Sequence, residues 1–220
     1  MKDYRLIAFD LDGTMTDPAS GLVKSFAYAL DRMHVNYGDR KNLLQFIGPP
    51  LHDEWKRVYG FSEEEADRAL AYFHEYFSVK GWCDNRVYDG IPEMLGALRS
   101  AGKKMILATS KPENFAKMIL DLFSLTPYFD GIYGAAGEKV RDKKWEVLAY
   151  GLSYFPDVPK TQCILVGDRK YDAEGAAVCG IDSLGVLYGH GTAEELAAAP
   201  FTAVVDTVAG IVDFLCERVE

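Results

Sequence analysis

The sequence lacks long apolar runs and any cysteine pattern typical of zinc sites. No stretch approaches the about 18 consecutive apolar residues of a membrane-spanning helix, so we expect no membrane segment. The first segment, MKDYRLIAFD, has neither an apolar core nor a small-residue cleavage site, and we expect no secretory signal. The cysteines are scattered, which favours free thiols and a reducing, cytoplasmic location. They are Cys83, Cys163, Cys179 and Cys216.

The chain also lacks an excess of positive charge. It has 24 Lys and Arg residues against 33 Asp and Glu residues, a formal net charge of −9. An acidic surface repels nucleic-acid phosphates and anionic lipids, so we expect no nucleic-acid polymer and no membrane as a partner. A small anionic substrate remains compatible, because a lysine, a metal ion or backbone N–H groups can bind it locally. Whether the protein is a monomer or a homodimer stays open.

Short apolar segments alternate with helical patterns from residue 88 onward. Strands are predicted at 4–9, 104–108, 131–133, 163–166, 183–186 and 203–205. Helices are predicted at 91–101, 112–123, 143–154, 173–179, 193–198 and 207–219. This alternation predicts an α/β fold with a Rossmann-like parallel sheet and helices on both faces.

Residues 17–87 interrupt this alternation directly after the first strand. Helices are predicted there at 22–33, 51–59 and 63–79. Phe26, Leu30 and Met33, for example, lie on one apolar helix face. We therefore expect an α/β catalytic core formed by residues 1–16 and 88–220, and an inserted all-helical domain formed by residues 17–87.

The first predicted strand ends in the segment Asp10-Leu-Asp-Gly-Thr14, which brings two carboxylates together. Residues two apart in an extended chain point the same way, about 6.6 Å apart. Like charges at ~4 Å repel by about 1 kcal/mol in water and about 4 kcal/mol at an effective dielectric near 20. Such a pair needs a cation or a shared proton. Mg²⁺ fits, because it prefers hard oxygen ligands and keeps exchangeable waters for phosphate.

Three further polar segments follow or flank strands of the same predicted sheet. Thr109-Ser110-Lys111-Pro112 is expected at a helix entrance, where hydroxyl and N–H groups can bind phosphate. A basic run could offset the repulsion between carboxylates and phosphate; it comprises Lys139, Arg141, Lys143 and Lys144. Asp168 and Asp172, after the strand at 163–166, offer further carboxylates for a cation.

Each of these segments alone is also compatible with a structural role. A polar turn, a helix cap and a solvated basic face need no ligand, and His190 in Gly-His-Gly is expected to be an ordinary loop residue. Their order is more informative, because the carboxyl ends of parallel strands meet at one edge of a sheet. We therefore expect the four segments to converge.

In this order the motifs resemble the haloacid dehalogenase (HAD) superfamily, over essentially the whole chain. The motifs are D-x-D-G-T, a strand followed by Thr-Ser, a lysine, and G-D-x-x-x-D. The helical insertion is similar to the C1-type cap of that superfamily. The segments YDGIPEML and Phe46–Leu51 (FIGPPL) resemble the phosphoglycolate phosphatase and 5′-nucleotidase-like branch.

The resemblance implies a Mg²⁺-dependent phosphatase that forms an aspartyl-phosphate. Its substrate would be a small phosphorylated metabolite of the phosphoglycolate or nucleoside 5′-monophosphate type. Asp10 would attack phosphorus, and Asp12 would protonate the leaving oxygen and then activate water. Thr109 would hold the phosphoryl oxygens together with the N–H group of Ser110.

The resemblance also implies a site lysine and a set of metal ligands. KWEVL matches the pattern that follows the superfamily lysine, which assigns Lys144, with Lys143 as the alternative. The implied metal ligands are Asp10, Asp12 through its carbonyl group, and Asp168, with Asp172 supporting them or bound through water.

An acid at Asp12 favours a phosphatase over a dehalogenase, because a leaving alkoxide needs a proton. The alternatives are a phospho-aspartate regulatory or binding module without turnover, a pyrophosphatase, and a sugar-phosphate mutase of the same superfamily. The absence of a basic residue at 46–51 disfavours the mutase, since the mutases that the chain resembles grip a second phosphate there with arginine.

Overall fold

The computed structural model describes residues 2–48, 51–136 and 140–216. Contacts divide the chain into two compact units, one formed by Met1–Asp17 and Val87–Glu220 and the other by Pro18–Arg86. Strands β2 (Thr16–Asp17) and β3 (Arg86–Val87), where the chain passes between the units, pair in a two-stranded sheet. Among the described residues, no helix is both long and apolar enough to cross a bilayer.

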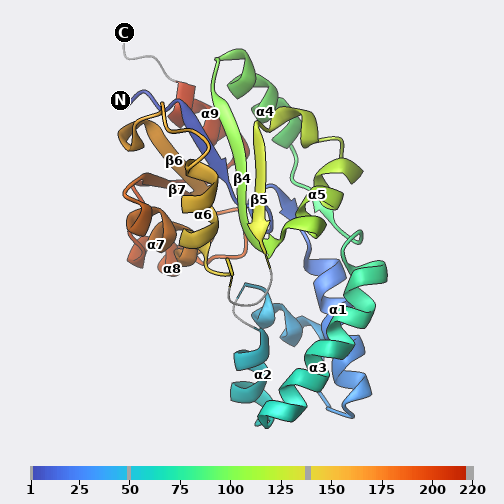
Figure 1. The fold of residues 1–220 in the computed structure, drawn as a ribbon. Coiled ribbons are helices and arrows are strands. Elements are labelled where there is room, and N and C mark those ends of the chain that lie inside the picture. Colours follow the sequence, from blue (N-terminus) through green and yellow to red (C-terminus); the bar gives the residue numbers. More distant parts are fainter. Residues whose placement is uncertain (1, 49–50, 137–139, 217–220) are drawn as a thin grey trace. The chain divides into compact units, whose positions relative to one another are not determined.

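A six-stranded parallel sheet forms the larger unit, in the order β5-β4-β1-β6-β7-β8 (Figure 1). Its strands are β1 (Leu6–Phe9), β4 (Lys104–Pro112), β5 (Gly131–Ala135), β6 (Cys163–Gly167), β7 (Asp182–Val186) and β8 (Ala203–Val205). Leu6 of β1 is opposite Lys104 on one side and Cys163 on the other. The carboxyl ends of β1, β4 and β6 therefore come to the same edge.

Helices cover both faces of this sheet. They are α4 (Ile91–Ser100), α5 (Glu113–Leu122), α6 (Lys144–Leu152), α7 (Lys170–Cys179), α8 (Ala193–Ala198) and α9 (Val208–Cys216), with short 3₁₀ helices η3 (Thr126–Tyr128) and η4 (Lys160–Gln162). Helices α6 and α7 lie on one face, and α4, α5 and α9 on the other (Figure 1). Right-handed crossovers explain the faces of α4, α5, α6 and α7, because the chain moves along the sheet in one direction from β1 to β5 and in the other from β5 to β7.

The core follows from the alternation of side chains along the strands. Leu6 and Ala8 of β1 belong to one apolar cluster with Val147 of α6 and Ala176 of α7. Ile7 and Phe9 are equally buried and point to the opposite face. Parallel strands are covered on both faces, and β1 accordingly consists only of apolar residues. The predicted fold class is confirmed.

The smaller unit is helical. It contains α1 (Ala19–Arg32), the 3₁₀ helix η1 (Arg40–Phe46), α2 (Leu51–Tyr59), α3 (Glu63–Tyr76) and the π-helix η2 (Phe77–Gly81). Ser62 and Glu65 form a capping box that begins α3. Aromatic rings fill the interior, with Phe26 stacked on Phe73 at 5.5 Å and edge-on to Trp55 at 6.4 Å. The all-helical insertion predicted from the sequence is confirmed.

The segment after Ala108 differs from the prediction. The strand predicted to end at Ala108 continues to Pro112, and α5 begins at Glu113 with Pro112 as its N-cap, within one residue of the predicted start. The register between β4 and β5 shifts between Ala108 and Pro112, so an irregular strand end precedes the helix. Residues 49 and 50 of the FIGPPL segment, and Lys139 of the basic run, lie outside the described residues.

Candidate active site

Asp10 stands at the end of β1, where its backbone N–H donates to the Val166 carbonyl at 2.9 Å. The chain then turns sharply through Gly13, whose φ of 83° favours glycine. A Cβ atom on Gly13 would lie 2.1 Å from Asp168 Oδ2. Glycine is therefore required by both the backbone and the neighbouring carboxylate.

Lys144 brings a positive charge to this point. Its Nζ lies 2.7 Å from Asp10 Oδ1 and 2.8 Å from Asp172 Oδ1, and it donates to the Ala108 carbonyl at 3.1 Å. Lys144 is buried, whereas Lys143 is exposed at the N-cap of α6. The structure thus places Lys144 at the carboxylate cluster and Lys143 outside it.

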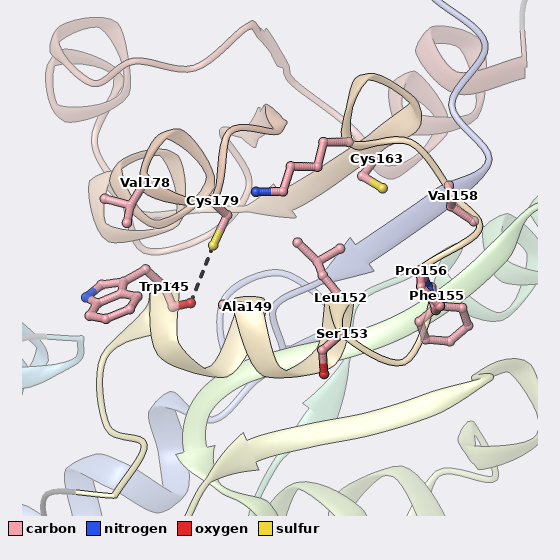
Figure 2. Close-up of a pocket in the computed structure, with 11 residues that line it drawn as sticks. Trp145, Ala149, Leu152, Ser153, Phe155, Pro156, Val158, Cys163, Val178 and Cys179 are labelled. Atoms are coloured by element: carbon pink, nitrogen blue, oxygen red, sulfur yellow. Dashed lines mark hydrogen bonds between the residues drawn. The ribbon is translucent and has the colours of Figure 1, made fainter.

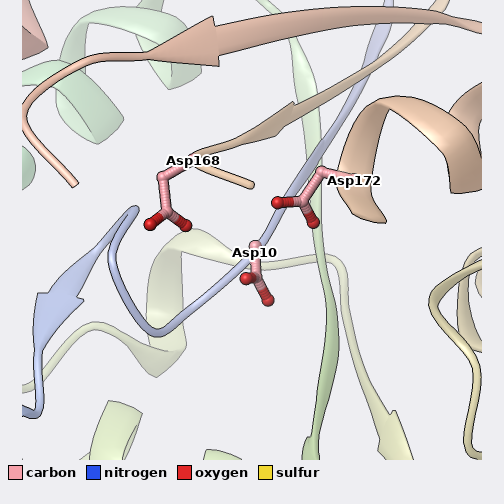
Figure 3. Close-up of side chains that lie close together, drawn as sticks. All are labelled: Asp10, Asp168 and Asp172. Atoms are coloured by element: carbon pink, nitrogen blue, oxygen red, sulfur yellow. The ribbon is translucent and has the colours of Figure 1, made fainter. Parts of the chain in front are cut away.

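Three buried carboxylates face one another beside this lysine (Figure 3). Asp10, Asp168 and Asp172 each offer an oxygen, and these oxygens lie within 4.8 Å of one another. Asp172 Oδ2 accepts a hydrogen bond from the Arg169 N–H at 3.0 Å, which holds it at the start of α7. The side-chain cluster contains Asp10 and Asp168 of the predicted ligand set together with Asp172, which was predicted to support them.

The cluster has more negative charge than its lysine neutralises. Burial, with the charges of Asp172 and Asp10, raises the pKa of Asp168 to about 8. Burial also raises the pKa of Asp172 to about 6, although Lys144 opposes that change. Burial alone would lower the pKa of Lys144, but the Asp10 and Asp172 carboxylates raise it. Oxygen ligands with unbalanced negative charge fit a hard divalent cation such as Mg²⁺.

Asp12 has a different cation as its partner. Lys111 Nζ lies 2.5 Å from Asp12 Oδ2, and the Lys111 side chain is 6% exposed. Asp12 Oδ1 is buried and receives no hydrogen bond from any residue that the structure describes. A buried oxygen of this kind can bind a cation or exchange a proton with a reacting group.

Lys111 belongs to the predicted Thr109–Pro112 segment, but the sequence assigned it no role of its own. The strand was predicted to end at residue 108, and only in a longer strand do the side chains of residues 109 and 111 point the same way. Lys111 also donates its backbone N–H to Thr109 Oγ1 at 3.3 Å. Thr109 is buried next to the Ala108 carbonyl that binds Lys144, whereas Ser110 is exposed.

Arg141, another residue of the basic run, binds groups outside the carboxylate cluster. Arg141 binds Glu113 Oε2 at 2.9 Å and the Gly134 carbonyl at 3.0 Å. His190 lies in a loop, as predicted, and its backbone N–H donates to Asp168 Oδ2 at 2.8 Å. The residues that converge at this edge of the sheet are thus Asp10, Asp12, Thr109, Lys111 and Asp168 from the strand ends, with Lys144 and Asp172 from the first turns of α6 and α7.

A separate cavity of about 410 Å³ lies beside α6 and α7 (Figure 2). Its lining includes Trp145, Leu152 and the thiols Cys163 and Cys179. The described lining is largely apolar and contains no carboxylate. It therefore lacks the carboxylate cluster found at the ends of β1 and β6, although Lys160 lines it.

Comparison with known proteins agrees with the carboxylate site. Residues 7–186 match the haloacid dehalogenase-like hydrolase family. A 5′-nucleotidase of Pseudomonas aeruginosa is 40% identical over 89% of this chain and 88% of its own length. A phosphoglycolate phosphatase of Pseudomonas fluorescens is 29% identical over 92% of this chain and 76% of its own.

Two further relatives extend the comparison. The tyrosine-protein kinase PtkA of Mycobacterium tuberculosis is 38% identical over 97% of this chain and 72% of its own length. The crystal structure of a putative phosphatase from Clostridium difficile is 43% identical, covers 98% of this chain and 100% of its own, and superposes with a TM-score of 0.90. The resemblance to the phosphatase and nucleotidase branch is confirmed. The chain belongs to the haloacid dehalogenase-like hydrolase family and is a phosphatase of that family.

Proposed function

We propose that the protein hydrolyses a small phosphomonoester through a phosphorylated Asp10, with Mg²⁺ as its cofactor. The observation that carries this proposal is the position of Lys144 Nζ, 2.7 Å from Asp10 Oδ1. An ammonium group there can offset the repulsion between the attacking carboxylate and the phosphoryl oxygens. It also holds Asp10 in one orientation for attack.

In the first step, an oxygen of Asp10 attacks phosphorus and the bond between phosphorus and the leaving oxygen breaks. The leaving oxygen takes a proton from Asp12, which ends the step as a carboxylate. We assign proton transfer to Asp12 Oδ1, because Oδ2 is bound to Lys111 and Oδ1 has no described hydrogen bond. Thr109 is the hydroxyl assigned to the phosphoryl oxygens.

In the second step, water attacks the phosphorus of the aspartyl-phosphate. Asp12 accepts a proton from that water, and the bond between phosphorus and the Asp10 oxygen breaks. Phosphate leaves, and Asp10 and Asp12 return to their starting states. The same residue serves as acid and then as base, which balances protons over the cycle.

The residues fit a divalent cation at Asp10 and Asp168, with the carbonyl group of Asp12 as a further ligand and Asp172 beside them. When bound, Mg²⁺ supplies positive charge for the phosphoryl oxygens and screens the carboxylates from one another. The raised pKa of Asp168, about 8, reflects buried negative charge that a cation would relieve.

The proposed substrates are phosphoglycolate and nucleoside 5′-monophosphates. The relatives named 5′-nucleotidase and phosphoglycolate phosphatase support this choice. Pyrophosphate and sugar phosphates belong in the same screen, because they correspond to the alternative activities of the superfamily.

The test is a phosphate-release screen over these four substrate classes, with and without Mg²⁺. We expect Mg²⁺-dependent release from one of the monoesters and, for Asp10→Asn, a loss of turnover with the melting temperature preserved. Full activity of Asp10→Asn would overturn the assignment. A stable acyl-phosphate with no phosphate release would instead favour a regulatory module.

A further inference from the structure

The loop after β7, Tyr188-Gly-His-Gly191, packs directly on Asp168. The backbone N–H of His190 donates to Asp168 Oδ2 at 2.8 Å. The hydroxyl group of Tyr188 donates to the carbonyl oxygen of Thr14 at 2.8 Å, and the Tyr188 ring packs edge-on against Tyr88 at 5.0 Å. The loop is therefore attached both to the carboxylate and to the turn that follows Asp10.

The two glycines allow this close approach. A Cβ atom on Gly189 would lie 2.4 Å from Asp168 Cβ and 2.4 Å from the Gly13 carbonyl oxygen. A Cβ atom on Gly191 would lie 2.0 Å from the Asp168 carbonyl oxygen. Any larger residue would push the loop away from Asp168 and remove the His190 N–H from its carboxylate.

Asp168 is held from the other side as well. Thr14 Oγ1 donates to Asp168 Oδ1 at 3.3 Å, so each carboxylate oxygen has its own donor. Tyr188 holds the carbonyl group of the same Thr14. The loop and the turn thus form one connected support that sets the orientation of the Asp168 carboxylate.

We propose that Tyr188 and Thr14 are positioning residues for the divalent cation, acting through Asp168. The proposal rests on the role of Asp168 as a metal ligand in the proposed function. A ligand already oriented by hydrogen bonds loses less conformational entropy when the ion binds. Groups that hold metal ligands in this way typically contribute 10–100-fold to metal affinity.

The experiment measures Mg²⁺ binding by isothermal titration calorimetry and by the Mg²⁺-dependent rise in melting temperature. The variants are Tyr188→Phe and Thr14→Val, which remove one hydroxyl each with little change in volume. Tyr4→Phe is the matched control, because the Tyr4 hydroxyl donates to Asp182 Oδ2 at 2.7 Å, at the opposite end of β7. Asp168→Asn reports whether Asp168 is a ligand at all.

We expect the Mg²⁺ dissociation constant to rise on the order of tenfold in Tyr188→Phe and in Thr14→Val, and to stay unchanged in Tyr4→Phe. Melting temperatures without Mg²⁺ show whether each variant folds. Unchanged Mg²⁺ affinity in both positioning variants, with binding lost in Asp168→Asn, would overturn this inference and leave the proposed function intact. Undiminished binding in Asp168→Asn would overturn the metal role and the inference together.

Discussion

Lys111 Nζ lies 2.5 Å from Asp12 Oδ2, although the two residues are 99 positions apart in the sequence. A different lysine, Lys144, binds the other aspartate of the motif, Asp10. Each of the two carboxylates thus has its own cation. This separation suits a pair whose members have different tasks, one as a nucleophile and one in proton transfer.

Replacing Lys111 should reduce turnover through Asp12. Lys111→Met removes the ammonium group that holds Asp12 Oδ2, so we expect kcat to fall on the order of 10–100-fold with a smaller change in KM. Lys143→Met is the matched control, because Lys143 is exposed and should leave kcat unchanged. Steady-state kinetics measure kcat and KM of both variants. A Lys111→Met variant with the same kcat as Lys143→Met would show that Lys111 has no role in turnover.

Replacing Lys144 should be more damaging. Lys144→Met leaves Asp10 and Asp172 buried without their shared cation, so we expect a kcat loss of at least about 100-fold. Breaking a buried ion pair from one side typically costs about 3–5 kcal/mol, so urea unfolding of the metal-free protein should report lower stability. A Lys143→Met variant that loses more activity than Lys144→Met would reverse the assignment.

Two glycines should respond oppositely to the same substitution. Gly13→Ala combines a positive φ with a contact of 2.1 Å to Asp168 Oδ2, so we expect a loss of stability and of Mg²⁺ binding. Gly96→Ala lies in the interior of α4 with open space around it, and helix propensity should raise its free energy of unfolding by about 0.5–1 kcal/mol. Chemical denaturation of both variants measures the difference, and a neutral Gly13→Ala would contradict the close packing at Asp168.

The pKa of Asp168 predicts a pH dependence for the metal-free protein. Folding raises this pKa from 3.8 to about 8, so within that window the folded state binds a proton that the unfolded chain has lost. The contribution of Asp168 to the free energy of unfolding should therefore fall as pH rises. Melting temperatures of the wild type and Asp168→Asn, recorded from about pH 5 to about pH 8, isolate this contribution. Saturating Mg²⁺ should weaken the dependence, and an identical slope in both proteins would contradict it.

Much of the fold could be predicted because short apolar strands and amphipathic helices alternate clearly. All six predicted strands of the sheet are present, and α2 and α8 have the predicted bounds. The strand predicted to end at Ala108 was too short, since β4 continues to Pro112, whereas α5 begins at Glu113, within one residue of its predicted start. The short strand left Lys111 without a predicted orientation.

The sequence predicts which residues converge at the site better than it predicts which of them contact one another. Strand order implies that Asp10, Thr109 and Asp168 converge, because β1 lies between β4 and β6. Whether Lys143 or Lys144 is buried depends on the exact residue at which α6 begins. Sequence periodicity does not locate a helix start to within one residue. The support of Asp168 combines the His190 N–H, 22 positions away, with contacts of Thr14 to Asp168 and to Tyr188 that span 154 and 174 positions, and no local sequence pattern predicts it.

Covalent phosphorylation of Asp10 can be detected by mixing enzyme, Mg²⁺ and a substrate that it turns over, quenching in acid, and mapping phosphorylated peptides by mass spectrometry. We expect an acyl-phosphate on Asp10 that hydroxylamine removes and that is missing from Asp10→Asn. Turnover by Asp10→Asn, or a phosphoryl group on another residue in its place, would contradict this expectation.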